Sequence, residues 1–275
     1  MLQCSVSIVF YNTDQKVADE TVRNLCSCSN IETIYILDNG GTIDFINIER
    51  MCHDSSKTIE ILRAENHGLA IAQNAIINHK DLSEFHLILN PDIFISEDCL
   101  TSLLRYLSKN KKVSAVGPKI NTPMGETYPS AKLNPDPITQ IIRRLFPKHK
   151  RNKVYELNSY DFSQPTCVPM ISGCFILSRS EFLKNINGFD EKFFLYFEDI
   201  DLLMRLKAFG EIHYYPNRNV THLHSDASRT SFKIMLYHLS SFFKYYSKWG
   251  WRLKKKLKDE NKTKTIAEEK FKNRI

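Results

Sequence analysis

Several features that would place a sequence in a well-marked class are missing from this one. No apolar run reaches the roughly 18 residues of a membrane-spanning helix, and the start of the chain has no basic, then apolar pattern typical of secretory signals. Glycine (9 residues) and proline (10 residues) are too scarce for a collagen-like or low-complexity chain of 275 residues. We therefore expect an ordinary globular protein with one large domain or two small ones.

Nucleotide-binding fingerprints and paired cysteines are also absent. The chain contains neither GxGxxG nor GxxxxGK[ST], so a dinucleotide-dependent dehydrogenase and a P-loop NTPase lose their main support. Its seven cysteines are an odd number without a CxxC pair, which argues against a disulfide framework and against a zinc site. Reduced thiols are typical of a cytoplasmic protein, and we expect that location.

Positive charge is concentrated at the end of the chain. The formal net charge is +7, and residues 252–275 hold ten Lys/Arg against four Asp/Glu. The other 251 residues carry 28 basic and 27 acidic side chains, so the body is nearly neutral. This distribution predicts a basic tail on a neutral domain and no nucleic-acid partner.

Apolar runs of strand length alternate with helical patterns over the first 120 residues. The runs lie at 5–10, 33–37, 58–62, 85–89 and 113–117, and the helical patterns at 14–28, 68–79 and 97–109. This alternation predicts an α/β fold with a largely parallel sheet flanked by helices. The five prolines of 121–168 predict a long loop region, and a helix over 198–210, a strand over 211–216 and a final helix over about 230–258 follow it.

Polar groups follow three of the predicted strands, where α/β sheets bind ligands. They are Asn12, Asp38 and the group Asn90-Pro91-Asp92. The Asp92 carboxylate, beside a buried strand, needs a partner, and a divalent cation bridging a nucleotide diphosphate would supply one. A simple turn is the alternative, because Asn-Pro-Asp is favourable turn chemistry.

Glu198 and Asp199 open a helix directly after the aromatic stretch FFLYF (193–197). The two carboxylates can cap the helix, or one of them can act as a general base beside aromatic rings that stack on a sugar. Asp201 stands four residues before Arg205, which predicts a surface ion pair. Later, His222 could complete a metal site with Asp92, although a pair of surface histidines is often inert.

These stretches together resemble the inverting nucleotide-sugar glycosyltransferases of the GT-A fold, the large family two. Within it the sequence is most similar to the branch that adds rhamnose to bacterial O-antigen or capsule glycans. The matching stretches are SIVFYN (7–12), LDNGG (37–41), ENHGLAIAQN (65–74), LNPDI (89–93), SGCFILSRSEF (172–182), NGFDEKFFLYFEDIDLLMRL (187–206) and His222 with Ser228-Arg229. They span about residues 5–250, with 121–168 poorly matched.

The resemblance implies a role for each matching residue. Asp199 corresponds to the catalytic base, with Glu198 as runner-up, and Asp92 with His222 corresponds to the metal site. Asn90 replaces the first carboxylate of the metal signature, which weakens one ligand. The implied donor-binding residues are Tyr11, Asn12, Asp38, Asn66, Gly68, Asn74, Asn90, Ser228 and Arg229, and the acceptor-binding residues are Phe194, Tyr196 and Phe197.

The resemblance also implies an activity. It is the transfer of L-rhamnose from dTDP-rhamnose to a lipid-linked surface glycan, with Mg²⁺ or Mn²⁺ as cofactor. A UDP-hexose donor (galactosyl, glucosyl or galactofuranosyl) and a catalytically inactive nucleotide- or glycan-binding relative are the alternatives. The expected domains are a catalytic domain over 1–230, with a nucleotide-sugar half at about 1–95 and an acceptor half at 96–230, and an extension over 231–275.

The extension combines an amphipathic helix with the basic tail. Its apolar residues recur at spacings of three and four, which predicts that the part up to about residue 247 packs on the catalytic domain. Trp249 and Trp251, followed by RLKKKLK (252–258), predict a contact with an anionic membrane surface, at the inner face of the cell membrane.

Overall fold

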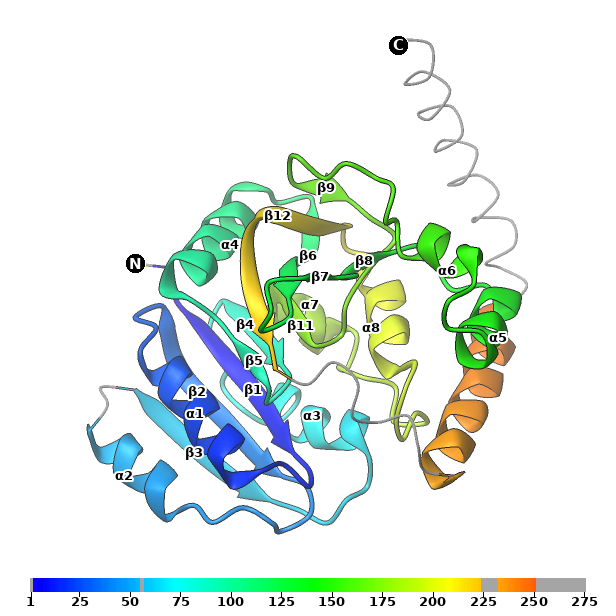
Figure 1. Cartoon of the computed structure of the whole chain (residues 1–275). Helices are drawn as coiled ribbons and strands as arrows, with labels where there is room; N and C mark the ends of the chain where they lie inside the picture. Colours follow the sequence, from blue (N-terminus) through cyan, green and yellow to red (C-terminus); the bar gives the residue numbers. More distant parts are fainter. Residues whose placement is uncertain (1, 55–56, 224–231, 251–275) are drawn as a thin grey trace.

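The computed structural model describes residues 2–54, 57–223 and 232–250 of the chain. A central twisted sheet divides the molecule, and helices cover both of its faces (Figure 1). The helices are α1 (Gln15–Cys26), α2 (Ile46–Asp54), α3 (Leu69–Ile77), α4 (Glu97–Lys109), α5 (Pro137–Leu145), α6 (Lys150–Tyr155), α7 (Ser180–Asn185), α8 (Glu198–Leu206) and a C-terminal helix over 232–250. Helices α1 and α4 pack on one face, and α3, α7 and α8 on the other.

The sheet is mixed and mostly parallel, which confirms the predicted fold class. Its order is β3-β2-β1-β4-β11-β6-β12-β5, with β11 antiparallel to both of its neighbours. These strands are β1 (Cys4–Phe10), β2 (Ile31–Asp38), β3 (Thr58–Arg63), β4 (Phe85–Leu89), β5 (Ile93–Phe94), β6 (Val113–Asn121), β11 (Phe175–Arg179) and β12 (Glu211–His222). All seven residues of β1 are buried, as expected for a central strand covered on both faces.

The segment 121–168 is not the long loop that its prolines predicted. It contains β7 (Thr127–Tyr128), β8 (Ala131–Lys132), α5, α6 and β9 (Thr166–Cys167), and β10 (Met170–Ile171) follows it. Pro137 begins α5 rather than interrupting it, because a proline at the first helical position leaves no needed N–H unpaired. Asp136 completes this start, since its carboxylate accepts a hydrogen bond from the Thr139 backbone N–H.

Two other elements of the structure differ from what the sequence predicted. Strand β12 continues to His222 rather than ending at residue 216, and its pairing with β6 shifts register between Tyr215 and Asn219. This irregularity accommodates Pro216, which cannot donate to a sheet. Helix α2 was not predicted; it is short, and the Asp44 carboxylate accepts a hydrogen bond from the backbone N–H at its start.

The C-terminal helix is held on α8 by a buried ionic network, which corrects two expectations. Asp201 is completely buried rather than at the surface. Its carboxylate accepts hydrogen bonds from Arg205 Nε at 2.8 Å and from Trp249 Nε1 at 2.7 Å, and Lys248 Nζ lies at 2.7 Å. Trp249 is therefore part of the docked helix and not a membrane anchor, whereas Trp251 and the basic tail lie outside the described residues.

Replacing Trp249 by phenylalanine is expected to lower the free energy of unfolding by about 1–3 kcal/mol, because a buried carboxylate loses one of its donors. Urea denaturation measures this. Phe243→Ala is the matched control on the same helix, since this side chain is 65% exposed and exposed substitutions usually change stability by less than about 0.5 kcal/mol. Equal losses in the two variants would contradict the role of the network.

Candidate active site

The predicted donor-side residues gather where β1, β2 and β4 end. The Asn39 backbone N–H donates to the Phe10 carbonyl at 2.8 Å, which joins the ends of β1 and β2. Tyr11 is half exposed, and its ring lies about 3.2 Å from the position of a Cβ on Gly40. The Tyr11 ring thus borders the loop after β2 and is accessible to a flat ligand such as a nucleotide base. Asn12 is exposed beside it.

The Asp38 carboxylate organises the loop after β2. It is fully buried and accepts backbone N–H groups from Gly41 at 3.1 Å, Thr42 at 3.4 Å and Ile43 at 3.3 Å. These bonds satisfy a charge that would otherwise be costly to bury. The visible role of Asp38 is to shape this loop, and its predicted contact with the nucleotide base stays a prediction.

Asn66 and Gly68 connect the donor side to the aromatic stretch. The Asn66 side-chain oxygen accepts hydrogen bonds from Asn39 Nδ2 at 3.1 Å and from the Gly68 backbone N–H at 3.0 Å. Gly68 has a φ of +102°, and a Cβ there would lie 2.7 Å from the Phe194 carbonyl oxygen. Only glycine satisfies both conditions, so this position brings the start of α3 against the acceptor-side segment.

Asn74 is used differently from the prediction. Its Nδ2 donates to the Phe189 carbonyl at 3.0 Å and to Glu191 Oε1 at 2.9 Å, and its Oδ1 accepts the Phe189 backbone N–H at 2.8 Å. Both amide hydrogens are occupied, and the side chain is buried. Asn74 therefore positions the 187–191 turn, and no amide hydrogen is left for a donor molecule.

Glu198 and Asp199 begin α8 after a sharp backbone turn. Tyr196 (φ 67°) and Phe197 (φ 65°) are both left-handed, a conformation that is costly for non-glycine residues and clusters at functional sites. The space for the Asp199 carboxylate exists because residue 173 is glycine: a Cβ there would lie 2.2 Å from Asp199 Oδ2. The sequence did not predict Gly173 as a site residue, although Gly173 lies in the matching stretch SGCFILSRSEF (172–182).

Burial separates the acidities of the two carboxyl groups. Burial, and then the neighbouring Asp199 charge, raise the pKa of Glu198 to about 8, so Glu198 is protonated at neutral pH. Burial also raises the pKa of Asp199, but the Lys132 ammonium and backbone N–H groups, that of Gly173 among them, oppose this by favouring the carboxylate. The arrangement favours Asp199 as the ionised member of the pair.

Lys132 comes from the segment that the sequence predicted to be a loop. It lies on β8, which pairs with β10 so that Lys132 stands opposite Met170, shortly before Gly173 in the chain. Its Nζ is 5.7 Å from the centroid of the Tyr128 ring, and that ring meets the His222 ring edge-on at 5.8 Å. Strands β7 and β8 thus connect the carboxylate pair to the predicted metal site; no sequence motif indicated this.

The two predicted metal ligands lie side by side. His222 Nε2 is 3.0 Å from Asp92 Oδ2, because β5 pairs with the end of β12. His222 Nδ1 is buried and has no hydrogen-bond partner among the described residues. One oxygen and one nitrogen donor, with an unsatisfied polar atom beside them, fit a divalent cation whose other ligands are diphosphate and water. Asn90 is half-buried at the end of β4.

The metal pair and the carboxylate pair share one site. Burial raises the pKa of the Cys174 thiol to about 11, and the charges of both Asp92 and Asp199 add to this shift. Cys174 follows Gly173, which borders Asp199, and its carbonyl accepts the Asn90 backbone N–H at 2.9 Å, so this residue lies near both groups as a neutral thiol.

The predicted acceptor-side rings divide into two kinds. Phe194 and Tyr196 are half-buried, whereas Phe197 is buried against Tyr245 at 5.3 Å between ring centroids. The left-handed turn directs Phe197 into the core, so it supports the site from behind and does not face an acceptor. Ser228 and Arg229 lie outside the described residues.

Comparison with known proteins decides the family. The profile of Glycosyl transferase family 2 matches residues 5–185. The chain belongs to this family. It is a glycosyltransferase, as the sequence motifs predicted, and the most specific part of the resemblance extends beyond the matched region to α8.

Two rhamnosyltransferases are among its relatives. The chain is 28% identical over 168 residues to the N-acetylglucosaminyl-diphospho-decaprenol L-rhamnosyltransferase of Mycobacterium tuberculosis, covering 58% of this chain. It is 26% identical over 167 residues to Rhamnosyltransferase WbbL of Escherichia coli K12, covering 60% of this chain. The match spans only 54% of the mycobacterial protein's length and 62% of the E. coli protein's length.

Solved structures confirm the GT-A-type fold. GalNAc-T7 with UDP, GalNAc and Mn²⁺ superposes with a TM-score of 0.61 at 16% identity, covering 81% of this chain and 43% of that one. The mannosyltransferase PcManGT from Pyrobaculum calidifontis, with GDP-Man and Mn²⁺, gives 0.60 at 15% identity, covering 90% and 65%. Both of these neighbours contain Mn²⁺.

Lys132→Met is expected to move the acid limb of the kcat/KM profile of this glycosyltransferase to higher pH. The ammonium lowers the pKa of Asp199, so its removal raises that pKa, and a higher pH is then needed to ionise the same fraction of the carboxylate. Lys132→Arg keeps the charge and is expected to keep the limb in place. A loss of rate without movement of the limb would mean that Lys132 acts only in packing.

Proposed function

We propose that this family 2 glycosyltransferase transfers L-rhamnose from dTDP-rhamnose to a lipid-linked bacterial surface glycan, with inversion at the sugar carbon. The observation that supports the reaction is the separation of the Glu198–Asp199 pair into a protonated and an ionisable group beside the Asp92–His222 pair. The choice of rhamnose rests on the two rhamnosyltransferase relatives. A UDP-hexose donor is the alternative.

In the proposed reaction Asp199 is the general base. As the acceptor hydroxyl oxygen forms its bond to the anomeric carbon, its proton passes to the Asp199 carboxylate, and the bond to the diphosphate oxygen breaks. A single displacement without a covalent enzyme intermediate inverts the anomeric carbon. Glu198 has an unsatisfied buried Oε2; as a neutral acid beside Asp199 it lets the pair hold one charge rather than two.

Mg²⁺ or Mn²⁺ is the proposed cofactor, held by Asp92 and His222. When bound, the ion supplies positive charge that offsets the charge developing on the leaving diphosphate. The donor occupies the ends of β1, β2 and β4, bordered by Tyr11 and the Asp38 loop. We keep the predicted division into a nucleotide-sugar half at about 1–95, an acceptor half at 96–230 and an extension over 231–275, whose described helix at 232–250 packs on α8.

Two substitutions separate the proposed roles. Asp199→Asn is expected to lower kcat by about 10²–10⁴-fold, the usual contribution of a general base, while dTDP binding by calorimetry stays near wild type. Asp92→Ala is expected to abolish the increase in dTDP affinity that Mg²⁺ or Mn²⁺ produces. A parallel run with UDP-hexoses tests the donor, and an Asp199→Asn enzyme with near-wild-type kcat would remove Asp199 as the base.

We also propose a membrane partner for the described part of the chain. The C-terminal helix exposes Phe232, Leu236, Leu239 and Phe243, between 44% and 70% of each side chain. Their spacing of four, three and four residues places them in one stripe on the side away from Tyr245, which is buried. An apolar stripe that faces outward marks an interaction surface, since monomers rarely expose such patches.

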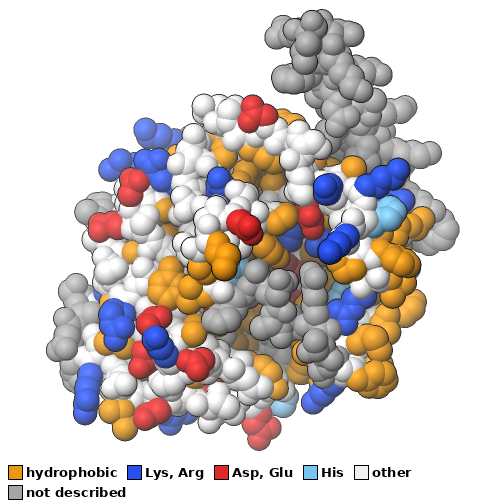
Figure 2. Space-filling model, in the orientation of Figure 1, with side chains coloured by type: hydrophobic (Ala, Val, Ile, Leu, Met, Phe, Trp, Pro, Cys, Tyr) orange, Lys and Arg blue, Asp and Glu red, His pale blue; other side chains and the backbone are white. Residues whose placement is uncertain are grey.

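A second stripe lies on the neighbouring helix α5. Ile138, Ile141 and Leu145 recur at three and four residues, and Phe146 follows them; each is at least 49% exposed. Figure 1 places α5 beside the C-terminal helix, and Figure 2 shows hydrophobic side chains gathered over this edge of the molecule. Burial lowers the pKa of His238, and the charges of Arg144 and Arg143 lower it further, so this end of α5 lies close to His238 on the C-terminal helix.

Positive charge beside the apolar stripes, and the closeness of the acceptor side, favour an anionic bilayer as the partner. Residues 137–155 contain no acidic side chain, and Lys148, Lys150, Arg151 and Lys153 are exposed beside the apolar stripes. None of the helices in the described ranges has the length and apolar character to span a bilayer. The inward side of the C-terminal helix contacts Phe194 and Tyr196 through Tyr237 and His238, so the acceptor side adjoins the proposed lipid contact.

The double variant Leu145→Asp/Phe243→Asp is expected to lower co-sedimentation with phosphatidylglycerol vesicles at least tenfold at low salt, because it places charge in the apolar stripes. Transfer to a water-soluble acceptor should be unchanged. The control is Met124→Asp, which alters a side chain that is 91% exposed outside these stripes. Equal vesicle binding by the double variant and wild type would assign this surface to a protein partner instead.

A further inference from the structure

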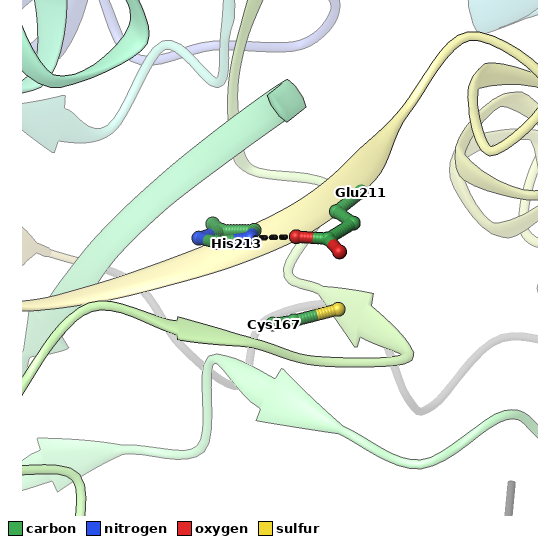
Figure 3. A group of neighbouring side chains, drawn as sticks. All are labelled: Cys167, Glu211 and His213. Carbon is green, nitrogen blue, oxygen red and sulfur yellow. Dashed lines mark hydrogen bonds and ion pairs between the residues drawn. The ribbon is translucent and has the colours of Figure 1, made fainter. Parts of the chain in front are cut away.

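We infer that Cys167, Glu211 and His213 form a zinc-binding site that is separate from the transferase site. The three side chains project to the same side of the sheet edge, with the sulfur beside the carboxylate (Figure 3). Their ligand atoms all lie within 4.8 Å of one another. This site lies at the start of β12, whereas the Asp92–His222 pair lies at its other end, so the proposal is independent of the transfer reaction.

The register of two strands builds the cluster. Glu211 and His213 are two residues apart on β12 and therefore share a face of the sheet. Strand β9 pairs antiparallel with β12 so that Cys167 stands directly opposite His213. Cys167 is 44 residues from Glu211 in the sequence, and the pairing of β9 with β12 brings the two together. This spacing matches no zinc motif.

The imidazole of His213 is held in the orientation that a ligand needs. Its ring is buried, its Nε2 lies 2.8 Å from Glu211 Oε2, and its Nδ1 lies 2.7 Å from the Tyr106 hydroxyl. Metal-ligating histidines almost always use the second ring nitrogen in this way, because the outer hydrogen bond fixes the ring and its tautomer. Tyr106, on α4, is the outer partner here.

The donor set selects the metal. A thiolate sulfur, an imidazole nitrogen and a carboxylate oxygen are ligands of Zn²⁺, which takes four ligands in a tetrahedron, so water would be the fourth. Mg²⁺ and Ca²⁺ prefer oxygen ligands and do not suit a thiolate. Glu211 is half-buried and Cys167 is exposed, so an ion can reach the site from solvent.

Binding of Zn²⁺ balances with the loss of one proton. The Cys167 thiol releases its proton to solvent as sulfur bonds to the metal. On His213 the Nε2 proton would pass to solvent as this nitrogen binds the metal, and Nδ1 would take up one proton from solvent and donate it to the Tyr106 oxygen, so the imidazole stays neutral and only the thiol proton is released in total. Lys112 Nζ, 3.5 Å from Glu211 and 70% exposed, can turn away when the carboxylate binds the ion.

The consequence of metal binding is a cross-link between β9 and β12. Strand β9 ends the segment 121–168, which carries Lys132, and β10 and Gly173 follow it directly. A zinc ion at Cys167 would therefore fix the return of this segment to the sheet, six residues before Gly173, which borders Asp199. We expect the ion to stabilise the folded chain rather than to take part in transfer.

The test uses the full-length chain, stripped with a chelator and titrated with Co²⁺ as a spectroscopic substitute for Zn²⁺. One equivalent is expected to produce a near-ultraviolet thiolate-to-cobalt charge-transfer band and the visible bands of tetrahedral cobalt, and Zn²⁺ should displace both. Cys167→Ser is expected to abolish the charge-transfer band, and Glu211→Gln to weaken Co²⁺ binding at least tenfold.

Two controls isolate the site. Cys26→Ser, a half-buried thiol on α1, and Asp92→Ala, at the proposed transferase metal site, should both keep the band. Circular dichroism checks that Cys167→Ser is folded, which its exposed edge position favours. Absence of the band in wild type, or its persistence in Cys167→Ser, would overturn the proposal; loss of transfer in Asp92→Ala alone bears only on the proposed function.

Discussion

The burial of two adjacent carboxyl groups at the start of α8 is the constraint on which the rest of the site depends. Two negative charges this close cannot both be sustained away from water. The surrounding structure meets this constraint with specific parts: Gly173 leaves room for Asp199, backbone N–H groups and Lys132 favour its charge, and Glu198 keeps its proton. The result is one carboxylate that can carry a charge, Asp199, and we propose this group as the general base of the family 2 enzyme.

The same helix connects the site to the end of the chain. Its first turn carries both Asp199 and the buried Asp201, and Asp201 is held by Arg205, Lys248 and Trp249. Arg205 also donates to the carbonyls of Ile186 and Gly188, and Asn74 secures the following residues. The 187–191 turn, α8 and the C-terminal helix therefore form one packed unit. A partner that contacts the C-terminal helix would lie behind the aromatic rings of residues 194–197.

The segment 121–168 matters more than its sequence indicates. Its weak resemblance to the family and its prolines predicted an irregular loop, yet it supplies Lys132 beside the base, the exposed stripe of α5 and the Cys167 side of the second cluster. Connecting segments carry binding and catalytic residues more often than the elements that they connect.

The sequence by itself determined the local features. Apolar runs with strand length gave β1, β2, β4 and β6, since continuous burial leaves a direct mark on composition. The block 187–206 predicted the helix that became α8 and carries the proposed base, because its residues are contiguous and their order is specific. Contiguity also located Asp92 after its strand.

Only the tertiary structure decided which distant residues meet. The positions of Lys132, Gly173 and the pair Asp92–His222 depend on the order and register of strands, which are set by long-range pairing and leave no spacing rule in the chain. Asp201 is the clearest case. Its spacing to Arg205 is typical of a surface ion pair, but the C-terminal helix, which comes later in the chain, covers this carboxylate and buries it. Periodicity reports which face of an element is apolar, but the partner that covers that face is chosen by the packing of the whole fold.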